Sequence, residues 1–562
     1  MKTKYIGTYE KIRFNHKKYN YLFKDEYLFR LYDLDSNKNN NFIENLEQVL
    51  NKDKKINFLK KKKEKYLKEI SKSLNKIHNS NHSKHEWGIL LDYYILISLI
   101  IIKRKYDTLI KIRDKKTIIN CSQVDFFFPD SDIYKEKLFA EKNLSKFIDF
   151  LIAKETNFTN IDYDIKKIFI KRTNPKKKIF QKILNFFYSL IVFFRKPTLI
   201  VDGYLGFKNS IKIMYRSKLK ILVSKYDYIE NLNYKKLSNK KEYKLRNKIK
   251  FNFKKDNFDN IFLQYVRNTI PGSFIENYSI FLKLNIFISK NISKIGSAIL
   301  FPSNDIFKFL TFRIKKRKKK LFTFQHGGLF DMRLFSPEDN LNKIYTDFNF
   351  LWHKKNGIGV PYFSEVNFKN NDNKNKILFF PTVTLFHEET ENLKLCNHLK
   401  LNQYFKLIPL LNNKSLNLYV KFPNYKTSNI SKKLWINKFG KKIKIVNNNY
   451  KGDIFNKFSL TIIDNFSTPF FELIYNKQPF VILNNSKLKE FKPGFRKIIY
   501  NLKKNKILFD NEKELANFIN KNSSNLIHYW SDVLNSKFFI NIRKKIFPNE
   551  KFLDSKLVKI LR

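Results

Sequence analysis

The sequence contains little cysteine, and its two cysteines, Cys121 and Cys396, lie far apart. Two separated thiols cannot build a disulfide framework or a cysteine-rich zinc site. We therefore expect a reducing, cytoplasmic setting. The N-terminal residues, MKTKYIGTYEKIRF, also lack the continuous apolar segment of a signal peptide, which agrees with this expectation.

Arginine is scarce too, although the formal net charge is +61: only 15 of the 111 basic residues are arginine. A nucleic-acid binder is expected to use the planar fork of arginine for phosphates and guanines. Lys, Asn, Ile, Phe and Tyr are all abundant, as in proteins from genomes rich in A and T. We therefore disfavour nucleic acid as a partner. The charge still favours peripheral contact with an anionic membrane, on the inner face of the cytoplasmic membrane.

Long apolar runs are also lacking, since none reaches the ~20 residues of a membrane-spanning helix. The longest runs cover residues 89–102 and 183–194, and Asp92 interrupts the first. For residues 183–194 we expect a buried core helix. The alternative is a helix that lies in the membrane interface, because basic segments flank this run on both sides.

Apolar and aromatic residues are plentiful, at 43% and 16%, and 562 residues are enough for two or more domains. Apolar residues recur at helical spacing at about residues 54–113, which predicts an N-terminal helical layer. Beyond Pro197 short β-branched runs alternate with helical segments, and this alternation predicts a parallel, doubly wound sheet. The runs cover residues 198–202, 219–224, 297–301 and 321–324.

A polar gap at residues 368–376 precedes a second alternating series. Its apolar runs are KILFF, LNLYV, KIKIV, SLTIID and FVILN, all between residues 376 and 484. We therefore predict an α/β chain with two Rossmann-like, doubly wound parallel-sheet domains that face a cleft. The first domain covers residues 1–370, with the helical layer, and the second covers residues 371–562.

Glycine is scarce, with 13 in the chain, yet two stand together in LFTFQHGGLFD at residues 321–331. Ligands bind at the carboxyl ends of parallel strands, where this turn is expected to lie. Gly327 and Gly328 allow positive φ and the close approach of a ligand or another backbone. His326 can take a proton near neutral pH. The turn is therefore a candidate site for a catalytic base or a phosphate-facing histidine. A polar turn that merely ends a strand is the alternative.

Residues 459–483 form the second candidate site, with the pattern strand, loop, helix, strand. Asp464 leaves the strand, and Ser467 or Thr468 can cap the helix that follows. A helix start with unpaired N–H groups and two hydroxyls suits the diphosphate of a nucleotide. Glu472 falls one turn further along, within reach of a ribose hydroxyl. The alternative is a well-capped structural helix.

Three motifs occur in an order that resembles a known family. The first motif, L-N-x-x-H with a later Ser and Trp, is formed by Leu74, Asn75, His78, Ser83 and Trp87. The second motif, Q-H-G-G with a later Glu and D-x-x-x-x-W, is formed by Gln325, His326, Gly327, Gly328, Glu338, Asp347 and Trp352. The third motif, D-x-x-x-T-x-x-x-E-x-x-x-x-x-x-P, is formed by Asp464, Thr468, Glu472 and Pro479. Together the motifs resemble a family of bacterial transferases from O-antigen and surface-polysaccharide loci.

The resemblance implies a GT-B-like fold and transfer of a sugar from a nucleotide-activated donor to a glycan or lipid-linked acceptor, such as O-antigen or capsule. It makes residues 1–370 the acceptor side and residues 371–562 the nucleotide-donor side. It also assigns roles to the motif residues. His326 and Glu338 would be catalytic and would lie on the turn made by Gln325, Gly327 and Gly328. Asp464, Ser467, Thr468 and Glu472 would bind the donor.

On the acceptor side the resemblance places His78, Trp87, Asp347 and Trp352. For His78 and Trp87 a packed hydrogen-bonding corner is the other interpretation. Lys421 ends a predicted strand and is a candidate donor-phosphate ligand, with a solvated lysine as the alternative. His78, His82 and His85 fall at helical spacing, but no Cys or H-E-x-x-H pattern accompanies them. We therefore expect no metal and no cofactor beyond the donor substrate.

Two other functions remain open at this level. The His-Gly turn and the Asp-Ser/Thr loop distantly resemble the glycerophosphate polymerases of teichoic acid synthesis, which implies a CDP-alcohol-dependent phosphotransferase. The second alternative is a non-catalytic, basic protein that binds polyanions.

Overall fold

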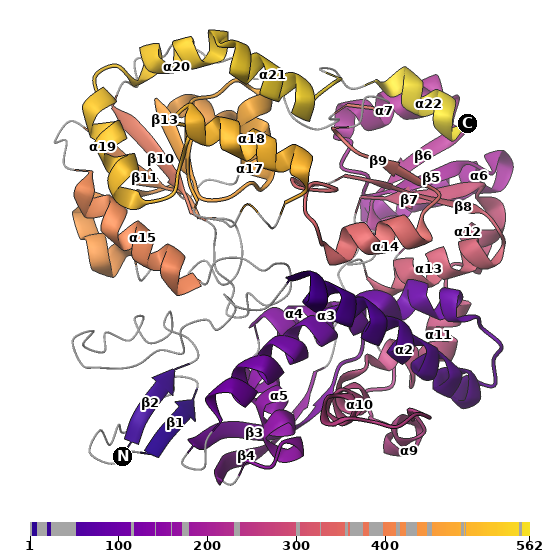
Figure 1. Cartoon of the computed structure of the whole chain (residues 1–562). Helices are drawn as coiled ribbons and strands as arrows, with labels where there is room; N and C mark the ends of the chain where they lie inside the picture. The colour runs from indigo at the N-terminus through magenta and orange to yellow at the C-terminus, as the bar shows by residue number, and fades with distance from the viewer. Residues whose placement is uncertain are drawn as a thin grey trace.

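Three parallel β-sheets organise the chain in the computed structural model (Figure 1). The structure describes residues 3–7, 19–23, 52–113, 117–140, 142–158, 160–170, 179–229, 236–298, 304–325, 327–353, 358–359, 375–381, 397–411, 416–422, 435–446, 452–484, 488, 491–549 and 553–562. Two of the sheets correspond to the two alternating series in the sequence, and the third was not predicted.

The first predicted series forms a five-stranded sheet with the order β6-β5-β7-β8-β9. Its strands are β5 (Thr198–Val201), β6 (Ile221–Ser224), β7 (Lys294–Ser297), β8 (Lys320–Phe324) and β9 (Phe348–Phe350). All neighbouring strands pair in parallel. The chain order reverses direction between β5 and β7, so this is the topological switch point, where open α/β sheets bind ligands.

Both faces of this sheet are buried, as its continuous apolar runs predict. In β5, Leu199 and Val201 pack into one core cluster, whereas Ile200 packs into a second cluster on the opposite face. The second cluster includes α22 (Asp554–Leu561), whose Leu557 and Leu561 are buried against the sheet. Figure 1 shows this last helix beside α7 (Phe207–Arg216), on the first sheet rather than on the second. The domain boundary at residue 370 stays a prediction.

The second series forms a six-stranded parallel sheet with the order β12-β11-β10-β13-β14-β15. Its strands are β10 (Lys376–Phe380), β11 (Asn417–Val420), β12 (Lys444–Ile445), β13 (Leu460–Ile463), β14 (Phe480–Leu483) and β15 (Leu508–Phe509). Numbered along the chain, this is the 3-2-1-4-5-6 order of dinucleotide-binding folds, with the switch point between β10 and β13. The predicted fold class, two Rossmann-like parallel sheets in an α/β chain of GT-B type, is confirmed.

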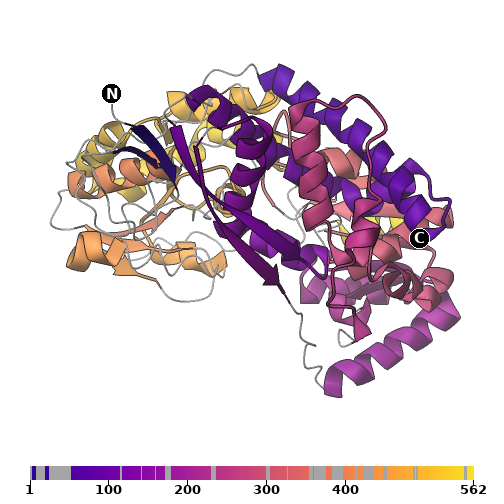
Figure 2. The same ribbon diagram turned by 90° about the horizontal axis from the view of Figure 1, so that it is seen from below.

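The unpredicted third sheet has the order β2-β1-β3-β4. It consists of β1 (Thr3–Gly7), β2 (Tyr19–Phe23), β3 (Thr117–Phe127) and β4 (Asn160–Phe169). Figure 2 shows β3 and β4 as two long neighbouring strands. Polar residues interrupt β3, TIINCSQVDFF, and β4 is largely exposed, so neither strand has the continuous apolar run by which the other strands were recognised.

Two long helices, α2 (Lys52–His78) and α3 (Lys84–Ile112), occupy the region of the predicted helical layer. A capping box starts α3: Ser83 accepts a hydrogen bond from Glu86 N, and Glu86 returns one to Ser83 N. Within the described part of the chain, α3 is the one helix long and apolar enough to cross a membrane, but 78% of its apolar window is buried. It therefore has the packing of a core helix.

The apolar run at residues 183–194 belongs to α6 (Ile179–Arg195). The expectation of a buried core helix is wrong here, because Val192 is the one residue of this run that is buried. We call the part of the molecule built around the five-stranded sheet the first lobe, and the part built around the six-stranded sheet the second lobe. Helix α6 lies at the edge of the first lobe (Figures 1 and 2). Its contacts are with small elements, and Tyr188 Oη anchors it by donating to Val223 O at 3.2 Å.

Candidate functional site

The turn after β8 meets the start of α17 (Thr468–Tyr475), so the two predicted site segments lie together although 140 residues of sequence separate them. A Cβ atom on Gly328 would lie 2.3 Å from the Phe471 ring and 3.0 Å from Phe466 O. A Cβ atom on Gly327 would lie 3.6 Å from Thr468 Oγ1, an ordinary contact. Gly328 is therefore needed so that the second lobe can approach the turn.

The predicted use of positive φ at these two glycines is wrong, since neither adopts it. Leu329 and Asp331, the residues just beyond them, do have positive φ values of 70° and 57°. Gln325 holds the turn from within: its Nε2 donates to Gly327 O at 2.8 Å, and its Oε1 accepts from Trp352 N at 2.9 Å. His326, the predicted base between them, lies outside the described residues.

Trp352 connects the two lobes at the same place. It follows β9, is buried, and packs edge-on against Phe471 of α17 with ring centroids 5.9 Å apart. Asp347 precedes β9, so it lies at the amino end of the sheet, where its Oδ2 accepts from Leu321 N at 2.7 Å and from Lys315 Nζ at 3.1 Å. The structure therefore brings Trp352, but not Asp347, to the turn.

The start of α17 is polar, and hydrogen bonds from neighbouring side chains hold the loop that leads into it. Asp464, buried at the end of β13, accepts a hydrogen bond from Tyr404 Oη of α15 (Asn397–Leu410), and its backbone O accepts from Asn484 Nδ2 at 3.0 Å. Asn465 Oδ1 accepts from Ser467 N at 3.0 Å. Ser467 is the N-cap residue of α17, but its side chain makes no capping hydrogen bond. Its hydroxyl is thus not committed to the helix.

These residues lie at the switch point of the second sheet, because Asp464 follows β13 and the neighbouring strand at the reversal is β10. Lys421 follows β11, the strand on the other side of β10, and is 1% exposed. The alternative of a solvated lysine is therefore wrong. Glu472 is buried one turn into α17. The four predicted donor residues of this segment and Lys421 all stand at the carboxyl edge of the sheet.

A short backbone pairing between residues 332–333 and residues 491–492, which we call the strap, joins the two lobes next to the turn. Arg333 pairs with Phe491 as an antiparallel β-bridge, and Lys492 N donates to Met332 O at 2.9 Å. Beside the strap, Asp331 forms ion pairs with two lysines: it accepts a hydrogen bond from Lys343 Nζ at 2.7 Å and one from Lys492 Nζ. Burial opposes the charged form of Asp331, but these two lysines outweigh it and hold its pKa below the ordinary value.

Helix α14 (Pro337–Tyr345) follows the turn in the chain and contacts the residues that lead out of it. Glu338, the second predicted catalytic residue, lies in its first turn and is half-buried. Asp339 Oδ2 accepts from Asp331 N at 2.8 Å. Burial raises the pKa of Asp339 to about 6, against the opposing effect of this hydrogen bond. The backbone N–H of Asp331, just after the turn, thus donates its hydrogen bond to a carboxyl group whose pKa is about 6.

The first motif of the sequence forms a packed corner between α2 and α3. Asn75 Oδ1 accepts from Trp87 Nε1 at 2.9 Å and from His82 N at 3.1 Å. His78 Nε2 lies 2.9 Å from Phe274 O, its ring stacks on Tyr278, and burial lowers its pKa. Trp87 is fully buried. These contacts favour the packed corner over an acceptor-side wall.

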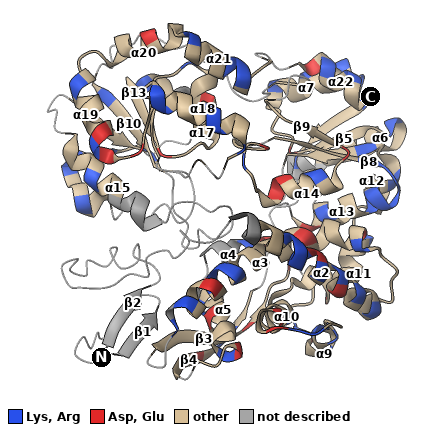
Figure 3. Ribbon diagram, viewed as in Figure 1, with Lys and Arg blue, Asp and Glu red and all other residues tan. Residues whose placement is uncertain are grey.

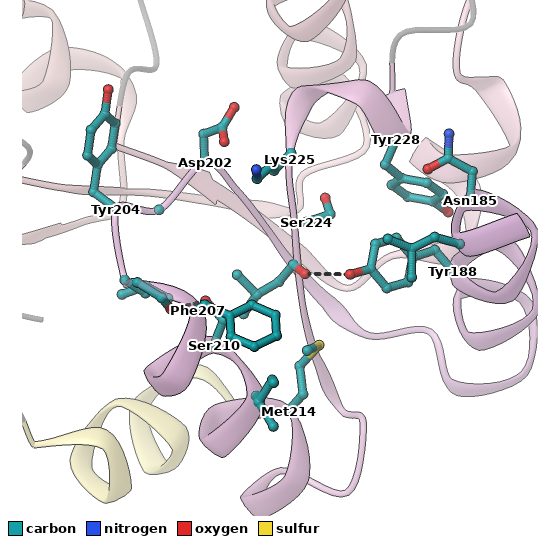
Figure 4. A pocket seen from close by; sticks show the side chains of 16 residues that line it. Asn185, Tyr188, Asp202, Tyr204, Phe207, Ser210, Met214, Ser224, Lys225 and Tyr228 are labelled. Carbon is teal, nitrogen blue, oxygen red and sulfur yellow. Dashed lines mark hydrogen bonds between the residues drawn. The ribbon is translucent and has the colours of Figure 1, made fainter. Parts of the chain in front are cut away.

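A cavity of about 640 Å³ lies at the carboxyl ends of β5 and β6, between α6 and α7 (Figure 4). Asp202, Ser224 and Lys225 stand at one end of it. Ser224 Oγ is buried without a hydrogen-bond partner among the residues the structure describes. The loop after β5 is strained at Asp202 and Tyr204, which have positive φ, whereas Gly206 has positive φ without strain because it lacks a Cβ atom. Sequence analysis missed this site, although D-G-x-x-G directly after a strand was a usable signal.

No metal centre is found in the part of the chain that is described: it holds no group of three or more His, Cys, Asp or Glu side chains that could bind a metal ion. His82, one of the three histidines considered, instead lies 2.7 Å from Tyr278 Oη through its Nε2.

Two Rossmann-like lobes that meet at a glycine turn and a polar helix start define a two-lobed α/β protein of GT-B type. A family model described as the LIC12162 family transferase matches residues 6–535. The chain therefore belongs to this family, and the prediction that it is a transferase is confirmed.

Comparison with solved structures finds remote similarity. TarM is 13% identical, with a TM-score of 0.28 and coverage of 48% of this chain and 53% of that chain. Spinosyn rhamnosyltransferase SpnG, complexed with spinosyn aglycone, is 8% identical, with a TM-score of 0.33 and coverage of 65% and 100%. MurG of Acinetobacter baumannii is 8% identical, with a TM-score of 0.26 and coverage of 65% and 98%. No curated protein matches the chain.

Proposed function

We propose that the protein is a glycosyltransferase that moves a sugar from a nucleotide-activated donor to a surface-glycan acceptor, such as O-antigen or capsule. The observation that carries this proposal is the approach of the turn after β8 to the start of α17, with Thr468 Oγ1 beside Gly327. A proton-accepting group on that turn would face an anion-binding helix start across the contact between the lobes.

In the proposed reaction the donor diphosphate binds at Ser467 and Thr468, at the start of α17, where the Ser467 hydroxyl makes no capping hydrogen bond and the helix dipole favours an anion. Lys421 adds positive charge at the same sheet edge, and Glu472 binds the ribose. Asp464 has a positioning role, because Tyr404 and Asn484 fix it below the loop. A helix dipole, hydroxyls and a lysine together can stabilise the leaving phosphate, so the proposal requires no metal ion.

The acceptor binds on the first lobe, and the cavity at Asp202, Ser224 and Lys225 is its proposed site. The acceptor oxygen attacks the anomeric carbon, and the bond from that carbon to the donor phosphate breaks. The acceptor proton passes to His326, and the nucleoside diphosphate leaves with the electron pair. Glu338, on the helix that follows the turn, supports His326. We further propose that the enzyme acts in the cytoplasm, on the inner face of the membrane.

The test is a thermal-shift panel of nucleotide sugars and free nucleotides, because a ligand that binds only the native form raises the unfolding temperature. We expect a nucleotide sugar to raise it, and His326→Ala to keep that shift while losing turnover. Full turnover in His326→Ala would remove the base assignment. Release of a nucleoside monophosphate from a CDP-alcohol, with no response to any nucleotide sugar, would instead establish the phosphotransferase.

A further inference from the structure

Helix α6 carries an apolar stripe that faces away from the protein. Seven of its large apolar side chains are exposed, and six of them, all except Leu184, recur at intervals of three, four and seven residues along one side of the helix. These six are Ile183, Phe186, Phe187, Leu190, Phe193 and Phe194. Phe186, at 62%, and Phe194, at 74%, are more exposed than is usual for phenylalanine in a folded domain.

A second stripe lies on α7, on the far side of the cavity from α6. Phe207, Ile211 and Tyr215 recur every four residues, and Phe207 and Tyr215 are 84% and 83% exposed. We call these three side chains and the six of α6 the α6–α7 face. Single exposed apolar residues are normal, but sets of exposed apolar residues on two helices that flank one cavity mark an interaction surface.

The surroundings of the α6–α7 face are strongly basic. Residues 179–229 contain nine Lys and Arg, two Asp and no Glu. Six of the lysines are exposed, and one of them, Lys212, forms an ion pair with Asp554 of α22. They are Lys196, Lys208, Lys212, Lys218, Lys220 and Lys225. Figure 3 shows Lys and Arg on α6 and on the neighbouring α12 (Ile286–Asn291), with little acidic colour near them. A partner with an apolar interior and an anionic rim would match both features.

The length of α6 restricts how it could meet a membrane. The helix has 17 residues, fewer than the ~20 needed to span a bilayer. It is also held near its C-terminal end by Val192, which is buried, and by the ring of Phe193, which stacks on Phe287 of α12 at 6.3 Å. Nearer its middle it is held by Tyr188 Oη, which donates to Val223 O. An amphipathic helix of this kind lies in the plane of the interface, with its apolar side among the acyl chains.

We propose that the α6–α7 face docks on an anionic lipid bilayer. A second copy of the chain fits the face less well, because a symmetric dimer would set the same basic rim against itself. Lysines near an anionic bilayer are instead favourable, because the negative surface potential attracts them. The bilayer therefore satisfies the apolar stripe and the basic rim together.

Docking in this orientation would give the cavity a membrane-side entrance. Leu184 and Tyr188 of α6 and Phe207 and Ile211 of α7 line it, while Asp202 stands at its inner end. An acceptor carried on a membrane lipid could pass between the two helices towards the carboxyl edge of the sheet. This step rests on the proposed function and names its acceptor class as lipid-linked; the docking itself does not depend on it.

The experiment measures co-sedimentation of the full-length protein with phosphatidylcholine vesicles that contain or lack phosphatidylglycerol. We expect binding to the anionic vesicles that weakens with salt, and about a tenfold or greater loss of binding in the double variant Phe187→Glu/Phe194→Glu. The matched control, Ile436→Glu/Tyr500→Glu, changes two exposed apolar residues of the second lobe, at 50% and 62%, and should bind like the wild type.

Equal binding by the two double variants would overturn the proposal, as would a wild type that ignores phosphatidylglycerol. A wild-type dimer in sedimentation velocity that Phe187→Glu/Phe194→Glu converts to a monomer would assign the face to a second copy. The thermal-shift response to the donor serves as the folding check and separates the hypotheses. A variant that has lost vesicle binding but still responds to the nucleotide sugar tests the surface without touching the proposed function.

Discussion

The loop after β13 in the second lobe and the loop after β5 in the first lobe leave their sheets beside the two switch points, yet they are held differently. The loop after β13 is supported by side chains: Tyr404 and Asn484 bond Asp464, and Asn465 bonds Ser467 N. The loop after β5 has three residues with positive φ and borders an open cavity. Under the proposed function, the first of these loops holds the donor and the second borders the acceptor.

The largest expected effect tests the contact between the lobes. Gly328→Ala would place a Cβ atom against Phe471 and a backbone oxygen, so we expect a loss of about 3 kcal/mol or more in the free energy of unfolding, and loss of turnover. Gly327→Ala is the matched control, because its Cβ has only an ordinary contact at 3.6 Å. Denaturant unfolding measures both. Equal costs would show that the lobes do not approach at Gly328.

The support under the first-lobe turn should depend on pH. The pKa of Asp339 is about 6 in the folded protein against 3.8 for the unperturbed group, so the folded state favours the protonated form. The resulting stability is full below pH 3.8 and is lost as the pH rises to about 6, by up to about 3 kcal/mol.

Asp339→Asn stays neutral and still offers an oxygen to Asp331 N. Its unfolding temperature should therefore gain on that of the wild type between pH 4 and pH 6.5, and the gain should then level off. A constant difference across this range, measured by thermal unfolding in a series of buffers, would contradict the raised pKa.

The hydroxyl of Ser467, which makes no capping hydrogen bond, allows an effect on donor binding to be separated from an effect on stability. Ser467→Ala removes no capping bond, so we expect little change in stability and about a tenfold weaker donor affinity, or about 1.4 kcal/mol. Asn511→Ala should do the reverse, because Asn511 caps α19 (Glu512–Asn522) by accepting from Glu514 N at 2.9 Å. It should cost about 1 kcal/mol of stability and leave donor binding unchanged. Calorimetric titration and thermal unfolding decide between the two patterns.

The smallest effect concerns positive φ in the first-lobe loop. Gly206 has φ +74° and open space around its missing Cβ, so Gly206→Ala should cost about 1 kcal/mol through the backbone alone. Gly494 also has open space, but it lies in α18 (Pro493–Lys504) without positive φ, so Gly494→Ala should stabilise by up to about 1 kcal/mol. Changes of opposite sign in the unfolding temperatures of the two variants would show that the positive φ at position 206 disfavours alanine. Changes of the same sign would contradict this.

Much of the fold was predictable because buried parallel strands are continuous apolar runs. The strands β5, β6, β8, β10, β11, β12, β13 and β14 were found in this way. The strands β9 and β15 were not predicted, and the run predicted at residues 297–301 overlaps β7 only at Ser297. The polar start of α17 was predictable for a similar reason, since Ser-Thr-Pro after a strand is a local pattern. The third sheet was missed because β4 is largely exposed and β3 is interrupted by polar residues, so neither shows a period.

Other failures came from contacts that no local pattern encodes. The paired glycines suggested close approach of a ligand or of another backbone, and the structure shows that Gly328 makes room for Phe471 and for Phe466 O of the other lobe. Residues 183–194 suggested a core helix, yet α6 is exposed while α3, of similar apolar character, is buried. Hydropathy describes what a helix could bury, and only the neighbouring elements decide whether it does.

The two sheets, the helix start at Ser467 and the family could be predicted because they depend on short-range patterns of apolar and polar residues and on motifs along the chain. Three features could be seen only in the folded molecule: the turn after β8 contacts α17, α22 returns to the first lobe, and α6 stays exposed. Each of these depends on contacts between residues far apart in the chain, and the shape and volume of both partners set such contacts.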